Sequence, residues 1–484
     1  MNRAQRRKQK NSKSNLRKAG LTYLTVAGVV GGTVGLATPV QAAVAATSCP
    51  TLLTGLQALE VNGGTLTADF AGTCDFGEGF IFSLPSTIIG PVDGSLTLRF
   101  TGDRVSTPVP VDYNADGLTG QADLTISNLN FTRPPNSGGF DYFVFGWATT
   151  TISNLTFSDA ELSAAVYAEG NLIVSDSTFE NLTSFNGGSA ITSTFAATIS
   201  NSTFSNNTAD GQASGGAILA SGSLEVTSST FDSNQAGDQG GAITSYAGAR
   251  ISNSTFVGNS AMSSAAVHLG EGGVISNSTF WNNGDADTFS IFAGGASPSY
   301  LFANILANDT PNTVKLIDPT QTTIDLGANL YTDSSIDDTT TGEGSSKLVT
   351  VGELKLSALA SANATSTETV AIGADSVAYD YYTADSPEIN PTSNGDFVDS
   401  LLASEDQRAA SRPLSNGYDV GAYESGEKPN PSPSEEPEIA DTEDSESLAD
   451  TGLETPTNFL GLIGVGLAAI LGGSVGLVRR RRKV

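Results

Sequence analysis

Oxygen-bearing side chains gather in one short stretch of the chain, between positions 112 and 123. Carboxylate or amide oxygens recur there at every second residue, and the glycine that follows permits a turn sharp enough to bring them together. A backbone carbonyl just after the glycine and an acid at the twelfth position complete a shell of hard oxygen ligands, the kind of shell that binds calcium. The predicted calcium ligands are Asp112, Asn114, Asp116, the carbonyl of Leu118, and Asp123.

The spacing of these ligands resembles that of EF-hand-like calcium loops, including dockerin-type loops in which the last ligand is Asp. Such loops lie between helices, whereas the residues on both sides of this stretch have the composition of strands. A surface turn rich in Asp and Asn explains the same residues without a metal. Calcium is therefore the one cofactor that the sequence suggests, and the metal-free turn stays open as the alternative.

A second candidate for chemistry is the peptide bond between Thr451 and Gly452, which is followed by 20 apolar residues over 459–478 and then a basic cluster. The apolar run is long enough to cross a bilayer, and the basic cluster favours the cytoplasmic side. The pentapeptide before it reads Leu448, Ala449, Asp450, Thr451, Gly452.

This order of elements resembles the sorting signal of sortase substrates in Gram-positive bacteria, in the LAxTG variant associated with class E sortases. The resemblance implies that a sortase cleaves after Thr451 and joins its carbonyl to an amine of a peptidoglycan precursor or a pilus subunit. An ordinary single-span membrane protein explains the apolar run and the basic cluster, but it does not explain the pentapeptide.

The N-terminus predicts export. Residues 1–18 contain eight Lys or Arg and no acid, Leu21 begins an apolar segment, and small residues precede Ala42. We interpret residues 1–42 as a signal peptide for the general secretory route. The mature protein is therefore expected to be secreted and anchored to the cell wall, with its precursor held in the cytoplasmic membrane.

Removing both signals makes the chain strongly acidic. The full chain has 23 basic and 51 acidic residues; cleavage removes 8 basic residues at the front, and 5 basic residues and one acid at the end. The remaining 10 basic and 50 acidic residues give a net charge near −40. Such a charge argues against nucleic acid as a partner. Only Cys49 and Cys74 are present, and in an exported protein they predict one disulfide near the start of the fold.

A repeat organises the middle of the chain. Phrases such as Ile199-Ser-Asn-Ser-Thr-Phe204 end at seven Phe residues spaced 22 to 27 residues apart, a period typical of a solenoid. Six of these Phe follow a β-branched aliphatic residue by thirteen positions, while the remaining part of each repeat varies in length. Segments rich in Ile, Val, Ser and Thr between Gly and Asn predict short strands and tight turns. The seven residues are Phe131, Phe157, Phe179, Phe204, Phe231, Phe256 and Phe280.

Alternation along these strands assigns their faces. Leu224, Val226 and Phe231 are expected to point into the core, and Thr244 to point outward. Asn residues three positions before the Phe, such as Asn201, are expected at corners, where they would stack as an amide ladder.

Two families are similar to parts of the chain. The FxxN motif at Phe204 and the GGA[ILV] motif at Gly215 resemble the repeats of chlamydial polymorphic membrane proteins, which are β-solenoid adhesins. Residues 406–412 and 419–424 resemble the end of choice-of-anchor Q proteins, which are parallel β-helix proteins. The SPxIx stretch at 386–390 departs from the SPAID of that family and lacks its Asp.

The resulting prediction is an all-β protein containing a right-handed parallel β-helix. The expected parts are the β-helix over 43–320, a C-terminal β-helix or cap region over 321–424, a disordered acidic stalk over 425–447, and the sorting signal with its transmembrane helix over 448–484. Within the cap region, Arg408 and Arg412 are expected to form ion pairs.

Three aromatic residues at outward positions form a candidate binding surface. Phe145 and Trp147 follow an inward aliphatic residue by one and three positions, and Tyr167 occupies the same kind of position in the next repeat. Exposed rings of this kind can stack on sugars. Cover by an N-terminal loop is the alternative that explains them without a ligand.

The sequence argues against catalysis. Right-handed β-helices include pectate lyases and polygalacturonases, but residues 142–300 contain a single Arg, Arg250, and a single His, His268, which is expected to face solvent. We therefore predict an adhesin or structural surface protein, binding a glycan or a host or neighbouring-cell ligand, and not an enzyme. The alternative is a polysaccharide-active β-helix enzyme, either a lyase or a glycoside hydrolase.

Overall fold

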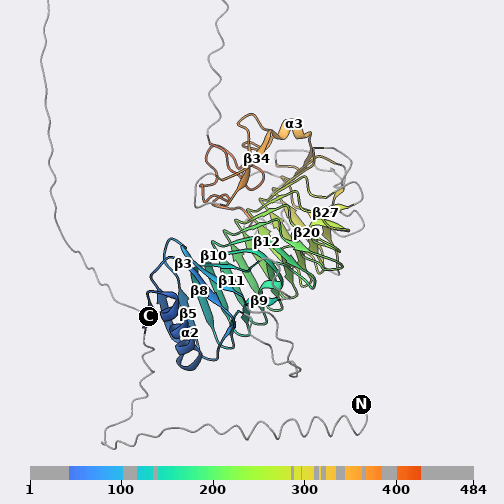
Figure 1. Cartoon of the computed structure of the whole chain (residues 1–484). Helices are drawn as coiled ribbons and strands as arrows, with labels where there is room; N and C mark the ends of the chain where they lie inside the picture. Colours follow the sequence, from blue (N-terminus) through green and yellow to red (C-terminus); the bar gives the residue numbers. More distant parts are fainter. Residues whose placement is uncertain are drawn as a thin grey trace, which may run out of the picture. The chain divides into compact units, whose positions relative to one another are not determined.

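The computed structural model of the protein describes residues 43–101, 117–134, 140–284, 288–295, 297–309, 315–317, 323–333, 344–361, 367–383 and 401–426. Successive coils of these residues stack by parallel strand pairing, as the repeat predicted (Figure 1). Within this part of the chain no helix is both long and apolar enough to cross a membrane. The expected signal peptide and sorting signal lie outside the described residues, and so does the expected stalk beyond residue 426.

Strands from successive coils form three parallel ladders, and the long strands β8 and β10 belong to more than one of them. The first ladder contains β2 (Gly64–Ala68), β5 (Ser86–Ile89), β8 (Leu124–Thr132), β10 (Thr150–Ala168), β11 (Leu172–Ser175), β14 (Ala197–Ser200), β18 (Leu224–Thr227), β22 (Ala249–Ser252), β25 (Gly273–Ser276), β28 (Ser299–Phe302) and β31 (Thr323–Asp325), with β1 (Ala43–Ala46) paired to β2.

The second ladder contains β3 (Gly72–Phe76), β6 (Leu96–Phe100), β8, β10, β12 (Thr178–Ser184), β15 (Thr203–Ser205), β19 (Thr230–Asp232), β23 (Thr255–Val257), β26 (Thr279–Trp281), β29 (Ile305–Ala307), β32 (Leu330–Tyr331) and β33 (Lys347–Leu348), with the short strands β16 (Thr208–Ala209) and β20 (Gln235–Ala236) beside it. The third contains β4 (Phe80–Phe82), β7 (Leu118–Gly120), β9 (Phe140–Gly146), β10, β13 (Ile191–Ser193), β17 (Ile218–Ala220), β21 (Ile243–Ser245), β24 (Ser264–Leu269), β27 (Phe289–Ala293) and β30 (Lys315–Ile317).

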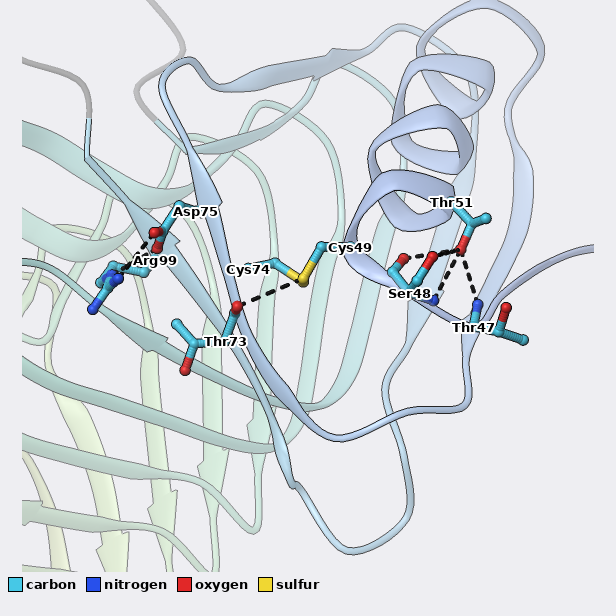
Figure 2. The surroundings of a disulfide bond; sticks show 8 residues. All are labelled: Thr47, Ser48, Cys49, Thr51, Thr73, Cys74, Asp75 and Arg99. Carbon is cyan, nitrogen blue, oxygen red and sulfur yellow. Dashed lines mark hydrogen bonds and ion pairs between the residues drawn. A yellow bond between two sulfur atoms is a disulfide. The ribbon is translucent and has the colours of Figure 1, made fainter.

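The helix α2 (Cys49–Asn62) covers the core of the first coils with one apolar side. Leu52, Leu56 and Leu59 on that side are buried in the same cluster as the first strands. Cys49 at the start of α2 is bonded to Cys74 of β3, with a Cα–Cα distance of 5.4 Å (Figure 2). The helix thus protects the end of a solenoid whose apolar interior would otherwise face water.

The core confirms the predicted row of Phe residues. All seven are fully buried, and the rings from Phe131 to Phe280 follow one another at centroid distances of 4.5 to 4.9 Å. These distances match the separation of hydrogen-bonded strands, about 4.8 Å. The β-branched residues thirteen positions earlier, such as Ile218 and Ile243, are also fully buried. The predicted assignment of inward faces is therefore correct.

The prediction that the corner Asn residues stack as an amide ladder is wrong, and a different row of Asn residues forms the ladder. Asn201 and its equivalents do occupy corners with positive φ, which Asn tolerates better than most residues. Their stacking is limited; Asn154 donates to Asn128 at 2.8 Å, and Asn201 donates to Asp176. The continuous ladder is formed by the buried Asn of the FxxN motif, in the order Asn207, Asn234, Asn259 and Asn283.

The region after β33 folds back onto the coils. It contains α3 (Val351–Leu354) and an antiparallel pair, β34 (Leu356–Ala360) and β35 (Thr369–Ile372). Leu354 and Tyr382 share an apolar cluster with Ile305 and Leu330 of the last coils. The region also contacts the flank of earlier coils, where Thr367 donates to the carbonyl of Ser228 at 3.1 Å. It therefore covers both the last coils and one side of the stack.

Candidate ligand-binding face

Of the predicted calcium ligands, the structure describes two. Asp112, Asn114 and Asp116 lie outside the described residues. Leu118 is buried at the start of β7, and the exposed Asp123 accepts a hydrogen bond from the Thr149 amide at 3.1 Å. Among the residues that the structure describes, no group of three or more His, Cys, Asp or Glu side chains is arranged to hold a metal ion.

The predicted aromatic residues lie together on the third ladder. Phe145 stacks on Tyr167 with a centroid distance of 5.2 Å, and Trp147 lies 5.3 Å from Phe145. Phe145 is 4% exposed, whereas Trp147 is 40% exposed. The prediction that Phe145 is exposed is wrong, because neighbouring aromatic rings pack around it, and Trp147 is the most exposed of the three predicted residues.

The first ladder carries two hollows on its outer surface. A cleft of about 730 Å³ lies between the corners of the coils and residues 401–409, and its walls are largely polar. A more open groove of about 630 Å³ lies over the beginning of the same strands. Each hollow is lined by residues from five successive coils, so both extend along the axis of the solenoid. We call this surface of β14, β18, β22 and β25 the ligand face.

Arg250 lies between the two hollows and lines both of them. Its neighbours across the parallel strands are Glu225 and Val274. Among the described residues, its guanidinium makes no ion pair and no hydrogen bond, although it is only half-exposed. A strongly acidic protein thus presents an uncommitted cation, with five N–H donors, between these two hollows.

Residues 138–304 match the family model of a right handed beta helix region. The fold is a right-handed parallel β-helix. No curated protein and no solved structure matches the chain.

The wall of the polar cleft is held to the β-helix by side chains of its own. Gln407 donates to Thr230 at 2.8 Å and accepts from Thr255 at 2.6 Å. In the next coils, Asn253 donates to the carbonyl of Glu405 and Asn277 to that of Leu401. These bonds fix residues 401–409 along the β-helix and give the cleft a defined width. The sequence does not predict this wall, because nothing in the repeat shows where a distant segment docks.

The predicted ion pairs of Arg408 and Arg412 are confirmed. Arg408 binds Asp406 through a short hydrogen bond and lies over the ring of Tyr423, 3.5 Å from its centroid. Arg412 is buried, with its Nε 3.7 Å from Oε2 of Glu424.

Burial and the neighbouring Asp419 raise the pKa of Glu424 to about 7, although Arg412 opposes this rise. Burial also raises the pKa of Asp419. A β-helix whose C-terminal region is held by such a cluster is expected to be sensitive to pH near neutrality.

His268 does not face solvent, contrary to the prediction. Its ring is 9% exposed and stacks on Phe292 at 4.6 Å, with Nδ1 3.3 Å from the Ser264 hydroxyl. Burial lowers its pKa to about 4, so that the imidazole is neutral at pH 7. His268 lines neither of the two hollows.

Thr244, in the same outward row, is fully buried and donates to the carbonyl of Gln239 at 2.8 Å. The prediction that Thr244 is exposed is therefore wrong. The loop of the GGA motif covers it, since a Cβ on Gly240 would lie 2.2 Å from its hydroxyl oxygen.

Proposed function

We propose that the protein is a sortase-anchored β-helix protein of the cell surface, which acts as an adhesin or structural component and binds a ligand on the face around Arg250. The partners in this proposal are a class E-like sortase, a peptidoglycan precursor or pilus subunit, and an extracellular ligand. The pentapeptide ending at Gly452, followed by an apolar run and a basic cluster, supports the anchor.

One observation carries the binding part of the proposal, namely the uncommitted guanidinium of Arg250 between two hollows. A half-buried cation without a partner loses hydration and gains nothing in return within the protein. A ligand rich in hydroxyl or carbonyl oxygens would satisfy its donors. The Asn, Ser and Thr side chains along both hollows would supply further hydrogen bonds.

Calcium is the cofactor in our proposal, bound by the oxygen ligands between Asp112 and Asp123. The spacing of these ligands supports it. Calcium there would neutralise several carboxylates in an acidic chain and would stabilise the folded protein by binding it in preference to the unfolded chain.

The anchor is tested with Thr451→Ala in the producing bacterium. The parent protein should be released from cells only by enzymes that degrade the wall, whereas the variant should be extracted by detergent. Release of the variant only by wall-degrading enzymes would contradict the proposal.

Binding is tested by probing an array of glycans and host proteins with the purified chain and with Arg250→Ala. The matched control is Arg99→Ala, which removes the same charge from an exposed ion pair with Asp75, well away from the face. Loss of signal with Arg250→Ala alone supports the proposal, and equal signals from the three proteins contradict it. Shortened glycans in the array wells would instead favour the polysaccharide-active enzyme.

A further inference from the structure

The turns that lead from the third ladder into the first ladder form one edge of the groove. Hydrogen bonds between neighbouring turns fix their register; the amide of Thr194 donates to Ala168, that of Ser221 to Ser193, and that of Tyr246 to Ala220. The groove begins directly after this edge, at Ala196 and Ala247.

Large aromatic side chains occur on this edge only in alternate coils. Phe195 is 62% exposed and Tyr246 is 43% exposed. They occupy neighbouring positions of the turn, since Tyr246 is equivalent to Ser221, and Phe195 to Gly222. Gly222 lies directly against the backbone of Phe195, because a Cβ on it would lie 2.3 Å from the Phe195 carbonyl oxygen. Two coils earlier, Trp147 continues the same edge. The edge therefore alternates aromatic coils with coils that carry small or polar residues.

The spacing of these rings follows from the core. Neighbouring coils are separated by 4.8 and 4.7 Å at the stacked Phe rings of the same coils. Phe195 and Tyr246 are thus two coils apart along the axis, roughly 9.5 Å. In a β-1,4-linked pyranose chain each ring is turned over relative to the last, so the same ring face recurs at every second sugar. The length of two sugars in such a chain is close to the axial distance between the coils of Phe195 and Tyr246.

The charges beside the edge favour a neutral chain. Glu225 and Glu271 line the groove together with Arg250, so the groove offers both acceptors and donors to hydroxyl groups. An anionic polysaccharide would meet two carboxylates there, and it would also meet the net negative charge of the mature protein.

We propose that Phe195, Tyr246 and the adjoining groove bind an extended, neutral β-1,4-linked polysaccharide whose chain runs along the axis of the β-helix. This inference deepens the proposed function by naming its ligand class, and it rests on that function. Successive aromatic coils contact every second sugar, while Arg250 and Glu225 bind hydroxyl groups of the rings over the groove.

The test is titration calorimetry of the full chain, purified in detergent, with cellohexaose and chitohexaose, which distinguish a plain glucan from an N-acetylated one. Maltohexaose, in which the linkage is α-1,4 and the chain is curved, is the ligand control. We expect one β-1,4 hexamer to bind and the maltohexaose to bind at least about 10-fold more weakly. The corresponding disaccharide should also be much weaker, because it cannot span two aromatic coils.

Phe195→Ala and Tyr246→Ala should each weaken binding at least about 10-fold, which corresponds to about 1.4 kcal/mol. Phe185→Ala removes a ring that is 54% exposed from the same coil, on the side away from the groove, and should change affinity less than about twofold. Phe195→Tyr keeps a ring at the position and should keep affinity, which separates loss of stacking from misfolding.

Failure of both β-1,4 hexamers to bind, or equal effects of Phe195→Ala and Phe185→Ala, would overturn the inference. If the array shows an Arg250-dependent ligand of another class, the proposed function stands and this inference fails. If neither the array nor the hexamers give a signal, both fail.

Discussion

Replacing Phe231 by Ala should remove the centre of the stacked core row. The Phe231 side chain is fully buried, and its ring lies 4.8 Å from that of Phe204 and 4.7 Å from that of Phe256, nearly parallel to both. The neighbours on both sides are fixed by backbone pairing, so the coil cannot collapse into the space that the ring leaves.

The magnitude follows from burial and stacking together. Phe→Ala in a core costs about 3 to 5 kcal/mol of the free energy of unfolding, with the upper end for sites that cannot collapse. Two aromatic contacts are lost as well, each contributing about 0.5 kcal/mol or more beyond burial. We therefore expect Phe231→Ala to lower the free energy of unfolding by about 4 to 5 kcal/mol. Phe231→Leu, which keeps most of the volume, should cost about 1.5 kcal/mol.

Urea unfolding followed by fluorescence, with linear extrapolation to water, measures these changes. Phe185→Ala is the matched control, because its ring is exposed and its loss should stay within about 0.5 kcal/mol. A Phe231→Ala variant that unfolds within about 1 kcal/mol of the parent, or together with Phe185→Ala, would refute the stacked-core explanation of the repeat.

Three further outcomes test the ladder, the buried acid and the calcium loop. Asn234→Ala should cost roughly 3 kcal/mol, since it leaves the amide of Asn207 and the carbonyl of Phe204 without their buried partner, whereas the exposed Asn186→Ala should be neutral in the same urea assay. Because the pKa of Glu424 is raised to about 7 from 4.5, the stability it contributes is fully present below about pH 4.5 and is lost as pH rises through 7. Thermal midpoints between pH 4.5 and 8 should therefore fall more for the parent than for Glu424→Gln, and parallel curves would count against this. Calcium should raise the thermal midpoint of the parent and not that of Asp116→Ala; equal midpoints with calcium and with chelator would exclude a stabilising site.

Most of the fold was predictable from the sequence because the same short pattern of residues recurs in successive coils. A Phe every 22 to 27 residues, with an aliphatic residue thirteen positions before it, defines both the coil and its inward face. Asn at the corners was also predictable, since few residues other than Gly accept positive φ. The sequence likewise identified the two cysteines that the structure joins.

The solvent exposure of a side chain was harder to predict than whether it points into or away from the core. Thr244 and His268 do point away from the core, as alternation requires, yet both are buried because the variable part of each repeat folds over them. Alternation predicts which side of a strand a residue occupies, and it says nothing about what covers that side. Phe195 shows the reverse case, since it lies in a turn without any periodic pattern and is more exposed than Tyr246 and Trp147 on the same edge.

The polar cleft depends on long-range hydrogen bonds through which equivalent Asn residues of successive coils have different partners. Asn128 and Asn154 bond to each other along the corner, whereas Asn253 and Asn277, at the same place in later coils, bond to the carbonyls of residues 401–405. The corner Asn side chains can bond to this segment because the hydrogen-bonded Asn of the FxxN motif already hold successive coils together. The buried row of Asn side chains thus leaves the corner Asn side chains able to bond to residues 401–405. Residues 401–409, held in this way, form one wall of the cleft beside Arg250, and the corners of the coils form the other.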